Sequence, residues 1–396
     1  MAPLTGLIDC EMPLIRYLQA LRAPGRVTAS TYCGIGDGKS ESGFLYHTQN
    51  TPFGWTCPGW EFCWGWSAVA PAWILHNVYE IYLFSANKQL LEEIYPMLKE
   101  ATLTYDALMD KSGERWLISP SFSPEHGPIT HGNTFDQIFI WQLYSDAIDA
   151  GSKLGEDEEK IEEWKEVLSK LKPIEVGVDN QILEWYHEKQ LGSVGEKHHR
   201  HVSHSMGLYP CALIGNNDSE LLQATKVSLE DRGDKSTGWA TALRLCLWAR
   251  LYDGGRAYKL VERLINNNIY QNLWDTHPPF QIDGNFGYVA GVCEMLVHSH
   301  GNAVKLLPTL PNEWSEGSVR GLRVRGGFAI DFSWKKCNWK EISVHALAEG
   351  EFRLEVVQDV KVTDGNVLEV EVVRDGNIVA WHCEKGHVYR VCKKKF

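Results

Sequence analysis

The chain has 396 residues, too many for one ordinary hydrophobic core, so we expect one large domain and a smaller one. The hydrophobic fraction of 44% and the charged fraction of 23% are typical of a soluble globular protein, and no apolar run approaches the ~20 residues of a membrane helix. A net charge of -12 would repel nucleic acid phosphates. We therefore expect neither a membrane nor nucleic acid as a partner.

The ten cysteines are scattered along the chain and form no Cys-x-x-Cys pair, so we expect reduced thiols and a cytoplasmic location. The opening segment, MAPLTGLIDCEMPLIRYL, lacks the basic segment and uninterrupted apolar core of a signal peptide.

Apolar residues spaced three and four apart predict helix after helix up to about residue 300. Some of these segments, such as 157–171, carry charges along one face, whereas others, such as 237–252, are apolar nearly all round. This contrast favours an inner and an outer ring of helices, an α/α toroid. The predicted helices cover residues 11–22, 65–85, 88–108, 134–153, 157–171, 218–231, 237–252, 255–268 and 285–299.

The pattern changes to an alternation of apolar and polar residues near residue 306. Glycine-containing turns interrupt this alternation, which indicates antiparallel strands. We therefore predict a toroid domain over 1–305 and a β-sandwich-like domain over 306–396. Strands are expected within residues 318–336, 340–357, 366–383 and 386–395.

The segment ISPSFSPEHG, residues 118–127, presents Glu125 on a loop that two Ser-Pro steps stiffen. Most glutamates are only solvated surface charges. Here, however, Phe122 and Trp116 could form an apolar wall that raises the pKa of Glu125, as a general acid requires near neutral pH. Glu125 is therefore our candidate acid.

A histidine-rich segment, GEKHHRHVSHSMGLYP, follows at residues 195–210. His201 and His204 could belong to a zinc site, but their spacing matches no common zinc pattern and no cysteine or carboxylate completes the set. The other interpretation is recognition of hydroxyl groups, since arginine and neutral histidine supply donors and acceptors for a sugar.

A third polar segment, WDTHPPFQIDGNFGYVAG, crowds Asp275, His277, Asp283 and Asn285 around prolines and glycines. The simple explanation is helix capping, with Asn285 as the cap and Asp283 left to point elsewhere. The chain also has 16 tryptophans, most of them expected in the core. Those at 55, 60, 64 and 66 lie among glycine and proline, which favours a loop. Two carboxylates, hydroxyl-matching groups and loop tryptophans together suggest glycoside hydrolysis.

Five motifs follow one another along the chain: SPSFSPEHG, HHRHVSHSMGLYP, STGWATALRLCLWARLYDGGRAYKLV, PPFQIDGNFGYVAGVCEML and LLPTLPNEWSEGSVRGLRVRGGF. In this order they resemble glycoside hydrolase family 95, which contains inverting α-L-fucosidases, chiefly α-1,2-specific, and some α-L-galactosidases. The resemblance implies an (α/α)6 toroid in which Glu125 is the general acid and Asp283 supports water activation. It also implies that Arg200 and His201 bind the fucosyl unit.

The remaining substrate-binding candidates are assigned more loosely. Trp64 or Trp66 could pack on the methyl edge of the sugar, and His204 and Asn285 lie within matching motifs. His47 and Asn50, in FLYHTQNTPFG, resemble a later family loop.

One departure concerns the water-activating asparagines, which the family carries in an upstream His-x-Asn-x-Asn stretch that this sequence lacks. The family's N-terminal β domain and the opening helices of the toroid are not found either. We therefore expect the C-terminal part of a longer enzyme. The resemblance predicts cleavage of a fucosylated oligosaccharide by single-displacement inversion, without cofactor or metal. The alternatives are a non-catalytic fucose- or galactose-binding fragment, an inactive truncated enzyme, an α-L-galactosidase and a zinc-dependent toroid enzyme.

Overall fold

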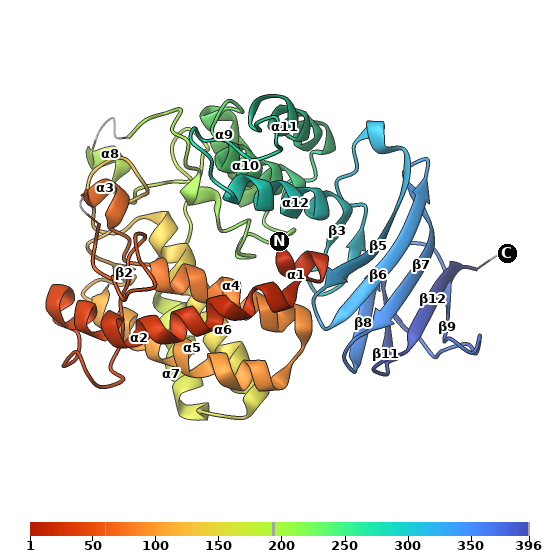
Figure 1. Cartoon of the computed structure of the whole chain (residues 1–396), viewed down its shortest axis with the longest axis horizontal. Helices are drawn as coiled ribbons and strands as arrows, with labels where there is room; N and C mark the ends of the chain where they lie inside the picture. The colour runs from red at the N-terminus through yellow and green to blue at the C-terminus, as the bar shows by residue number, and fades with distance from the viewer. Residues whose placement is uncertain (60, 192–194, 395–396) are drawn as a thin grey trace. The chain divides into compact units, whose positions relative to one another are not determined.

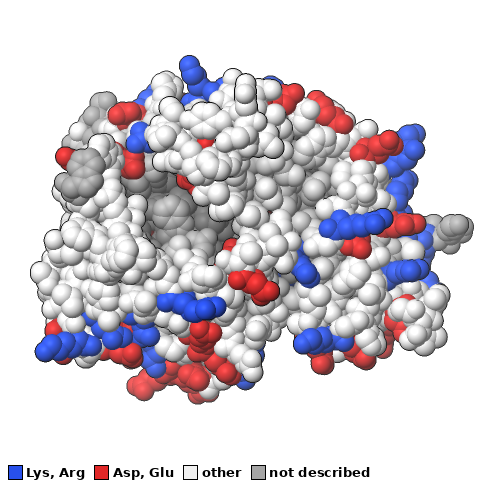
Figure 2. Space-filling model, viewed as in Figure 1, with Lys and Arg blue, Asp and Glu red and all other residues white. Residues whose placement is uncertain are grey.

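The computed structural model describes residues 1–59, 61–191 and 195–394. Trp60 and the last two residues of the predicted β domain lie outside them. The described chain forms two compact units. The helical unit comprises Glu11–Glu80 and Lys88–Gly233, and the sheet unit comprises Met1–Cys10, Ile81–Asn87 and Asp234–Phe396. No described helix combines the length and apolar character that crossing a membrane requires. Figure 2 shows acidic and basic side chains interspersed on the face it presents.

The helical unit consists of long helices joined by loops that carry most of the predicted functional residues (Figure 1). One of its helices, α4, continues into the sheet unit. Its elements are α2 (Met12–Cys33), α3 (Phe62–Gly65), α4 (Ala70–Ser85), α5 (Lys88–Leu108), β1 (Met109–Asp110), β2 (Leu117–Ile118), α6 (Thr134–Leu154), α7 (Glu158–Lys170), α8 (Glu188–Leu191), the 3-10 turn Ser203–Ser205 and α9 (Ser219–Arg232).

Helix α6 is the buried centre of this unit, and sequence signals mark both of its ends. Asn133 caps the first turn by accepting a hydrogen bond from the Asp136 amide, and Gly155 ends the helix in the left-handed region. Residues all round α6 are buried, whereas α7 buries only one stripe, formed by Ile161, Trp164 and Val167. The two helices pack together, so the predicted contrast between enclosed and amphipathic helices is present here.

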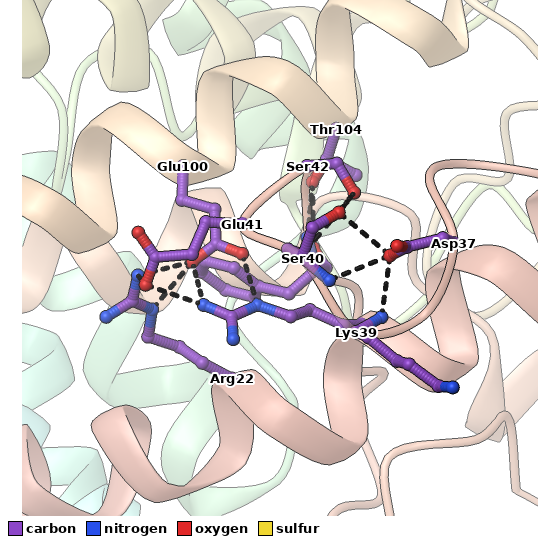
Figure 3. Close-up of polar contacts among 10 residues, drawn as sticks. Arg22, Asp37, Lys39, Ser40, Glu41, Ser42, Glu100 and Thr104 are labelled. Carbon is purple, nitrogen blue, oxygen red and sulfur yellow. Dashed lines mark hydrogen bonds and ion pairs between the residues drawn. The ribbon is translucent and has the colours of Figure 1, made fainter.

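A buried carboxylate, Glu100, joins α2 to α5 (Figure 3). The Arg22 Nε donates to Glu100 Oε2 over 2.7 Å, and the Arg26 Nε donates to Oε1 over 2.6 Å. Both guanidinium groups also bind Glu41 at about 3 Å. In the loop that follows α2, the Phe44 amide donates a hydrogen bond to Thr104 Oγ1 of α5. These contacts fix the chain that leads from α2 toward His47.

The sheet unit combines the last helices with antiparallel sheets. The elements of the sheet unit are α1 (Ala2–Thr5), the 3-10 turn Ile8–Cys10, α10 (Gly238–Arg250), α11 (Gly254–Asn267), α12 (Asp283–Leu296), β3 (Val297–His298), β4 (Lys305–Leu306), the 3-10 turn Asn312–Trp314, β5 (Glu316–Val324), β6 (Phe328–Lys335), β7 (Asn338–Ala346), β8 (Gly350–Glu355), β9 (Val360–Thr363), β10 (Val373–Asp375), β11 (Ile378–Cys383) and β12 (Val388–Lys393). In the five-stranded sheet the strand order is β5-β6-β7-β12-β9, and in the three-stranded sheet it is β10-β11-β8.

The alternating strand residues build one hydrophobic core in the sheet unit. Phe328 and Phe352 meet edge to face at 5.0 Å between ring centroids, and Trp381 lies 5.0 Å from Phe352. The end of α12 contributes Cys293 and Leu296 to the same core. Burial of these side chains therefore fastens the sheets to the last helix of the chain.

The predicted fold class, a mainly helical region followed by antiparallel strands, is confirmed. Each predicted helix has a counterpart, but α2 continues past Pro24 to Cys33, beyond the predicted end at residue 22. The short β1–β2 and β3–β4 pairs and strand β9 were not predicted, and no strand forms at residues 366–372. The predicted helix 285–299 is too long at its end, because residues 297–298 form β3. The ring closure and the domain boundary at 305/306 stay predictions.

We expect Glu100→Ala to lower the free energy of unfolding by about 3 kcal/mol, because it leaves two largely buried guanidinium groups without their main partner. Glu41→Ala is the matched control, since the Glu41 side chain binds the same arginines but is 68% exposed, against 3% for Glu100. It should cost less than about 1 kcal/mol. Urea denaturation of both variants checks the prediction, which equal losses would contradict.

Candidate active site

The loop that carries Glu125 runs from β2 to α6 and is closed at its base by backbone hydrogen bonds. The Ser121 amide donates to the Thr130 carbonyl over 3.0 Å, and the Thr130 amide donates back over 2.8 Å. The Ser119-Pro120 and Pro124-Glu125 peptides are cis. Gly127 has a φ of 79°, and a Cβ there would lie 2.6 Å from the Trp185 ring. The loop is therefore a fixed platform, as its prolines predict.

Glu125 lies against Arg200 and His201, the two residues predicted to bind the sugar. The Arg200 Nη2 donates to Glu125 Oε2, and the His201 Nε2 lies 3.5 Å from the same oxygen. Burial raises the pKa of Glu125, but His201 and Arg200 outweigh this effect, and the pKa is lowered from its ordinary value. The prediction that an apolar wall raises this pKa is therefore wrong.

The two aromatic residues proposed for that wall have other contacts. Phe122 meets Phe62 edge to face at 5.2 Å. Lys111 lies 5.0 Å from the centre of the Trp116 ring, and the Trp116 carbonyl accepts a hydrogen bond from Gln137. The sequence showed apolar residues near Glu125 along the chain, but the electrostatics of the carboxylate depend on a loop 75 residues away.

A stack of imidazole rings supports the loop that carries Arg200 and His201. The His126 and His199 rings lie 4.1 Å apart, and the His199 and His201 rings lie 5.3 Å apart. The His199 Nδ1 accepts a hydrogen bond from the His201 amide. Burial, with smaller contributions from His126 and His201, lowers the pKa of His199 to about 3, so this ring is neutral near pH 7.

Glu184 is a buried carboxylate behind the Glu125 loop, and it was not predicted from the sequence. Its Oε1 accepts from Ser123 Oγ at 2.6 Å and lies 3.1 Å from His126 Nε2, while its Oε2 accepts from Arg232 Nη2 at 2.5 Å. Burial raises the pKa of Glu184, but His204, His126 and Arg232 together lower it by more. The pKa is therefore below its ordinary value, and Glu184 is ionised. A glutamate inside the apolar stretch ILEWY is itself a signal, since buried glutamates are nearly always paired.

His204 lies behind the loop surface, buried against Glu184. Its Nδ1 is 3.5 Å from Glu184 Oε2. Its predicted role in substrate binding stays a prediction. Across the residues that the structure describes, no group of three His, Cys, Asp or Glu side chains is arranged to hold a metal ion.

The predicted binding residues His47 and Asn50 line a separate cavity of about 400 Å³. Tyr17 donates a hydrogen bond to Asn50 Oδ1, and His47 Nδ1 lies 3.0 Å from the Ser67 carbonyl. Burial lowers the pKa of His47 to about 4, so the ring is neutral. Asn50 and the neutral His47 therefore present uncharged polar groups beside this cavity.

The two loop tryptophans predicted to contact the sugar differ in exposure. The Trp66 ring is partly buried between His47, at 4.6 Å, and Phe62, at 5.7 Å. Trp64 belongs to the short helix α3 and is exposed. Trp64 is therefore the more exposed of these two tryptophans.

The prediction that Asn285 caps α12 is wrong, because the helix begins at Asp283 and contains Asn285 in its first turn. Asn285 instead binds the preceding loop: its Oδ1 accepts from the Asp275 amide, and its Nδ2 donates to the Leu273 carbonyl, both at 2.9 Å. Asp283 and Glu125 belong to different units, so their predicted cooperation stays a prediction.

Asp275 had no role assigned from the sequence. It is more deeply buried than Asp283. Burial and then the neighbouring Asp283 raise the pKa of Asp275 to about 6, and burial also raises the pKa of Asp283. A Cβ at Gly238 or Gly284 would come within about 2 Å of the Asp275 carboxylate, so a side chain at either position would displace that group. Two neighbouring carboxyl groups therefore lie near the start of α12, one in the preceding loop and one in the first turn.

Helices, an appended antiparallel region, and a carboxylate held against arginine and histidine indicate a helical glycoside hydrolase with a C-terminal β domain. Residues 1–296 match the model of the glycosyl hydrolase family 95 catalytic domain, and residues 298–391 match that of the glycoside hydrolase family 95 C-terminal domain. The chain belongs to glycoside hydrolase family 95, which confirms the resemblance of its motifs.

Two relatives are named as fucosidases. "Alpha-L-fucosidase 2" of Arabidopsis thaliana is 33% identical over 85% of this chain and 42% of its own length. "Probable alpha-fucosidase A" of Aspergillus niger is 30% identical over 83% of this chain and 45% of its own length. The chain thus spans less than half of each relative. Among solved structures, an α-L-rhamnosidase from Dictyoglumus thermophilum aligns with 94% of this chain and 45% of its own, at 13% identity and a TM-score of 0.46.

We expect Arg200→Gln to raise the pKa of Glu125, because the guanidinium favours the ionised carboxylate while burial opposes it. Carbon NMR of ¹³C-labelled glutamate side chains, with the Glu125 signal assigned by its loss in Glu125→Gln, measures the titration. Lys197→Gln is the control, since this exposed lysine on the same loop pairs with Asp231. A Glu125 titration that Arg200→Gln leaves unchanged would contradict the electrostatic account.

Proposed function

We propose that this chain carries the acid and the sugar-recognition groups of an α-L-fucosidase that acts on α-1,2-linked fucose in glycans. One observation carries the proposal: Glu125, Arg200 and His201 converge although they come from loops far apart in the sequence. The names of the two relatives support the choice of fucose.

The proposed reaction is a single displacement with inversion. Glu125 gives a proton to the glycosidic oxygen while water attacks the anomeric carbon from the opposite face, through an oxocarbenium-like transition state. Arg200 and His201 donate hydrogen bonds to hydroxyl groups of the fucosyl unit and orient it for attack. The family resemblance assigns Asp283 to the support of the attacking water, a role that stays a prediction, and Asp275 is the titratable neighbour of Asp283.

The lowered pKa of Glu125 reflects the contacts of its carboxylate with His201 and Arg200. A bound sugar engages these two groups with its hydroxyls and excludes water from the carboxyl group. Both changes favour the protonated form, since one weakens the attraction of the cation and the other strengthens desolvation. The site therefore acquires an acid near neutral pH only when it is occupied.

A second candidate function is fucose binding without turnover. The observation in its favour is the ion pair between Glu125 and Arg200, since an ionised carboxylate accepts hydrogen bonds from sugar hydroxyls but cannot protonate a leaving group.

Hydrolysis of 2′-fucosyllactose, followed by proton NMR, separates the two functions. We expect the first sugar released to be β-L-fucose, and Glu125→Gln to lower turnover about 10²- to 10⁴-fold, the usual contribution of a general acid. The exposed Glu114→Gln is the matched control and should keep normal turnover. Initial release of α-L-fucose would contradict inversion. Fucose binding in calorimetry without any release would favour the binding function.

A further inference from the structure

We propose that Glu184 is a positioning residue that holds the acid Glu125 and the recognition residues Arg200 and His201 in a fixed relation to one another. The proposal rests on the proposed function, because it assigns Glu184 a part in the same reaction. Glu184 lies on the stretch between α7 and α8, outside the loops that carry the three residues it would position.

On the acid side, Glu184 holds the residues that flank Pro124 and Glu125. Ser123 Oγ and His126 Nε2 bind the same oxygen, Oε1, at 2.6 and 3.1 Å. The backbone between these two anchors contains only Pro124 and Glu125. The direction of the Glu125 side chain is therefore set by two hydrogen bonds that end on one buried oxygen.

The contacts of His126 also determine which ring nitrogen carries the hydrogen. The Glu196 amide donates to His126 Nδ1 at 2.9 Å, so Nδ1 is an acceptor and the ring hydrogen lies on Nε2, which donates to Glu184. The Trp185 ring lies 5.2 Å from the imidazole and His199 stacks on it at 4.1 Å. The ring is therefore held by contacts on both nitrogens and by neighbouring aromatic rings.

On the recognition side, Glu184 acts through Arg232, the last residue of α9. Arg232 Nη2 donates to Glu184 Oε2 at 2.5 Å, and its Nε donates to the His201 carbonyl at 3.1 Å. Its Nη1 donates to the carbonyls of Glu196 and Lys197, at 3.1 and 3.0 Å. One guanidinium thus fixes the backbone on both sides of Arg200 and connects it to Glu184.

Burial makes this network firm and separates Glu184 from direct chemistry. Glu184 is 5% exposed and Arg232 is 9% exposed, and charge-assisted bonds are stronger in such surroundings. Both oxygens of Glu184 are occupied by Ser123, His126, Arg232 and the nearby His204. Glu184 therefore acts on the reaction only through the residues that it places.

A positioning role and a merely structural role differ in how activity depends on the leaving group. A sugar leaving group needs a proton from the acid, whereas fluoride departs from α-L-fucosyl fluoride without that help. Loss of correct acid placement should therefore slow hydrolysis of 2′-fucosyllactose much more than hydrolysis of the fluoride. Loss of folded protein would lower both rates by the same factor.

We expect Ser123→Ala, which leaves the Arg232 pair intact, to lower kcat on 2′-fucosyllactose about 10-fold and kcat on the fluoride less than about 2-fold. Glu184→Gln should show a larger difference, about 100-fold, and should also raise KM for both substrates, because the Arg200 loop loses its anchor. Glu184→Asp should restore part of the rate on the disaccharide, since it keeps the charge.

Glu100→Gln is the matched control, because Glu100 is a buried carboxylate that binds two arginines within the same unit (Figure 3) but contacts neither loop. Its ratio of the two rates should equal that of the wild-type chain. Equal losses on both substrates in Ser123→Ala and Glu184→Gln, or wild-type kinetics in both, would overturn the positioning role. A wild-type protein that hydrolyses neither substrate would instead overturn the proposed function.

Discussion

The buried pair of Glu184 and Arg232 is the interaction on which the candidate site depends. Bringing two charges out of water costs several kcal/mol per ion, and the cost is recovered only when every polar atom is satisfied. Here Ser123 and His126 bind one carboxylate oxygen of Glu184. Arg232 donates its remaining hydrogen bonds to backbone carbonyls of the Arg200 loop. The pair is therefore complete only when both loops are in place.

This requirement explains how the short loop of Glu125 and the longer loop of Arg200 are brought together. Prolines restrict the backbone of the Glu125 loop, but they do not determine which way the loop faces. The direction comes from Glu184, which lies between the loops in the sequence, binds the Glu125 loop directly and reaches the Arg200 loop through Arg232. Arg200 then reaches Glu125 across 75 residues of chain. His201 and Arg200 favour the ionised form of Glu125, and a bound sugar would redistribute these contacts.

Local pattern was enough to predict most of the fold. Helices such as α6 and α11 follow from apolar spacing and from caps at Asn133 and Asp253, because these signals act within a few residues. The helix predicted over 11–22 ends before Pro24, whereas α2 continues through this proline to Cys33. Strand β9 was missed because four residues carry too little alternation to be distinguished from a loop.

The site was predictable only where one segment carries its own signal. The loop motifs indicated Glu125, Arg200 and His201, but the sign of the Glu125 pKa shift depends on which groups face it in three dimensions. Glu184 and Arg232 sit in an apolar stretch and at a helix end, where neither resembles a functional motif. Asp275 was visible only as one of several acidic residues, and its burial against two glycines is a tertiary property.

The most direct test of this account is a double-mutant cycle between Ser123→Ala and Arg232→Lys, measured as the free energy of unfolding in urea. The two side chains bind different oxygens of Glu184: Ser123 comes from the Glu125 loop, and Arg232, from the end of α9, holds the Arg200 loop. If Glu184 couples the loops, the two losses should be non-additive by at least about 0.5 kcal/mol. Losses that add within about 0.3 kcal/mol would contradict the account, because each loop would then be held independently of the other.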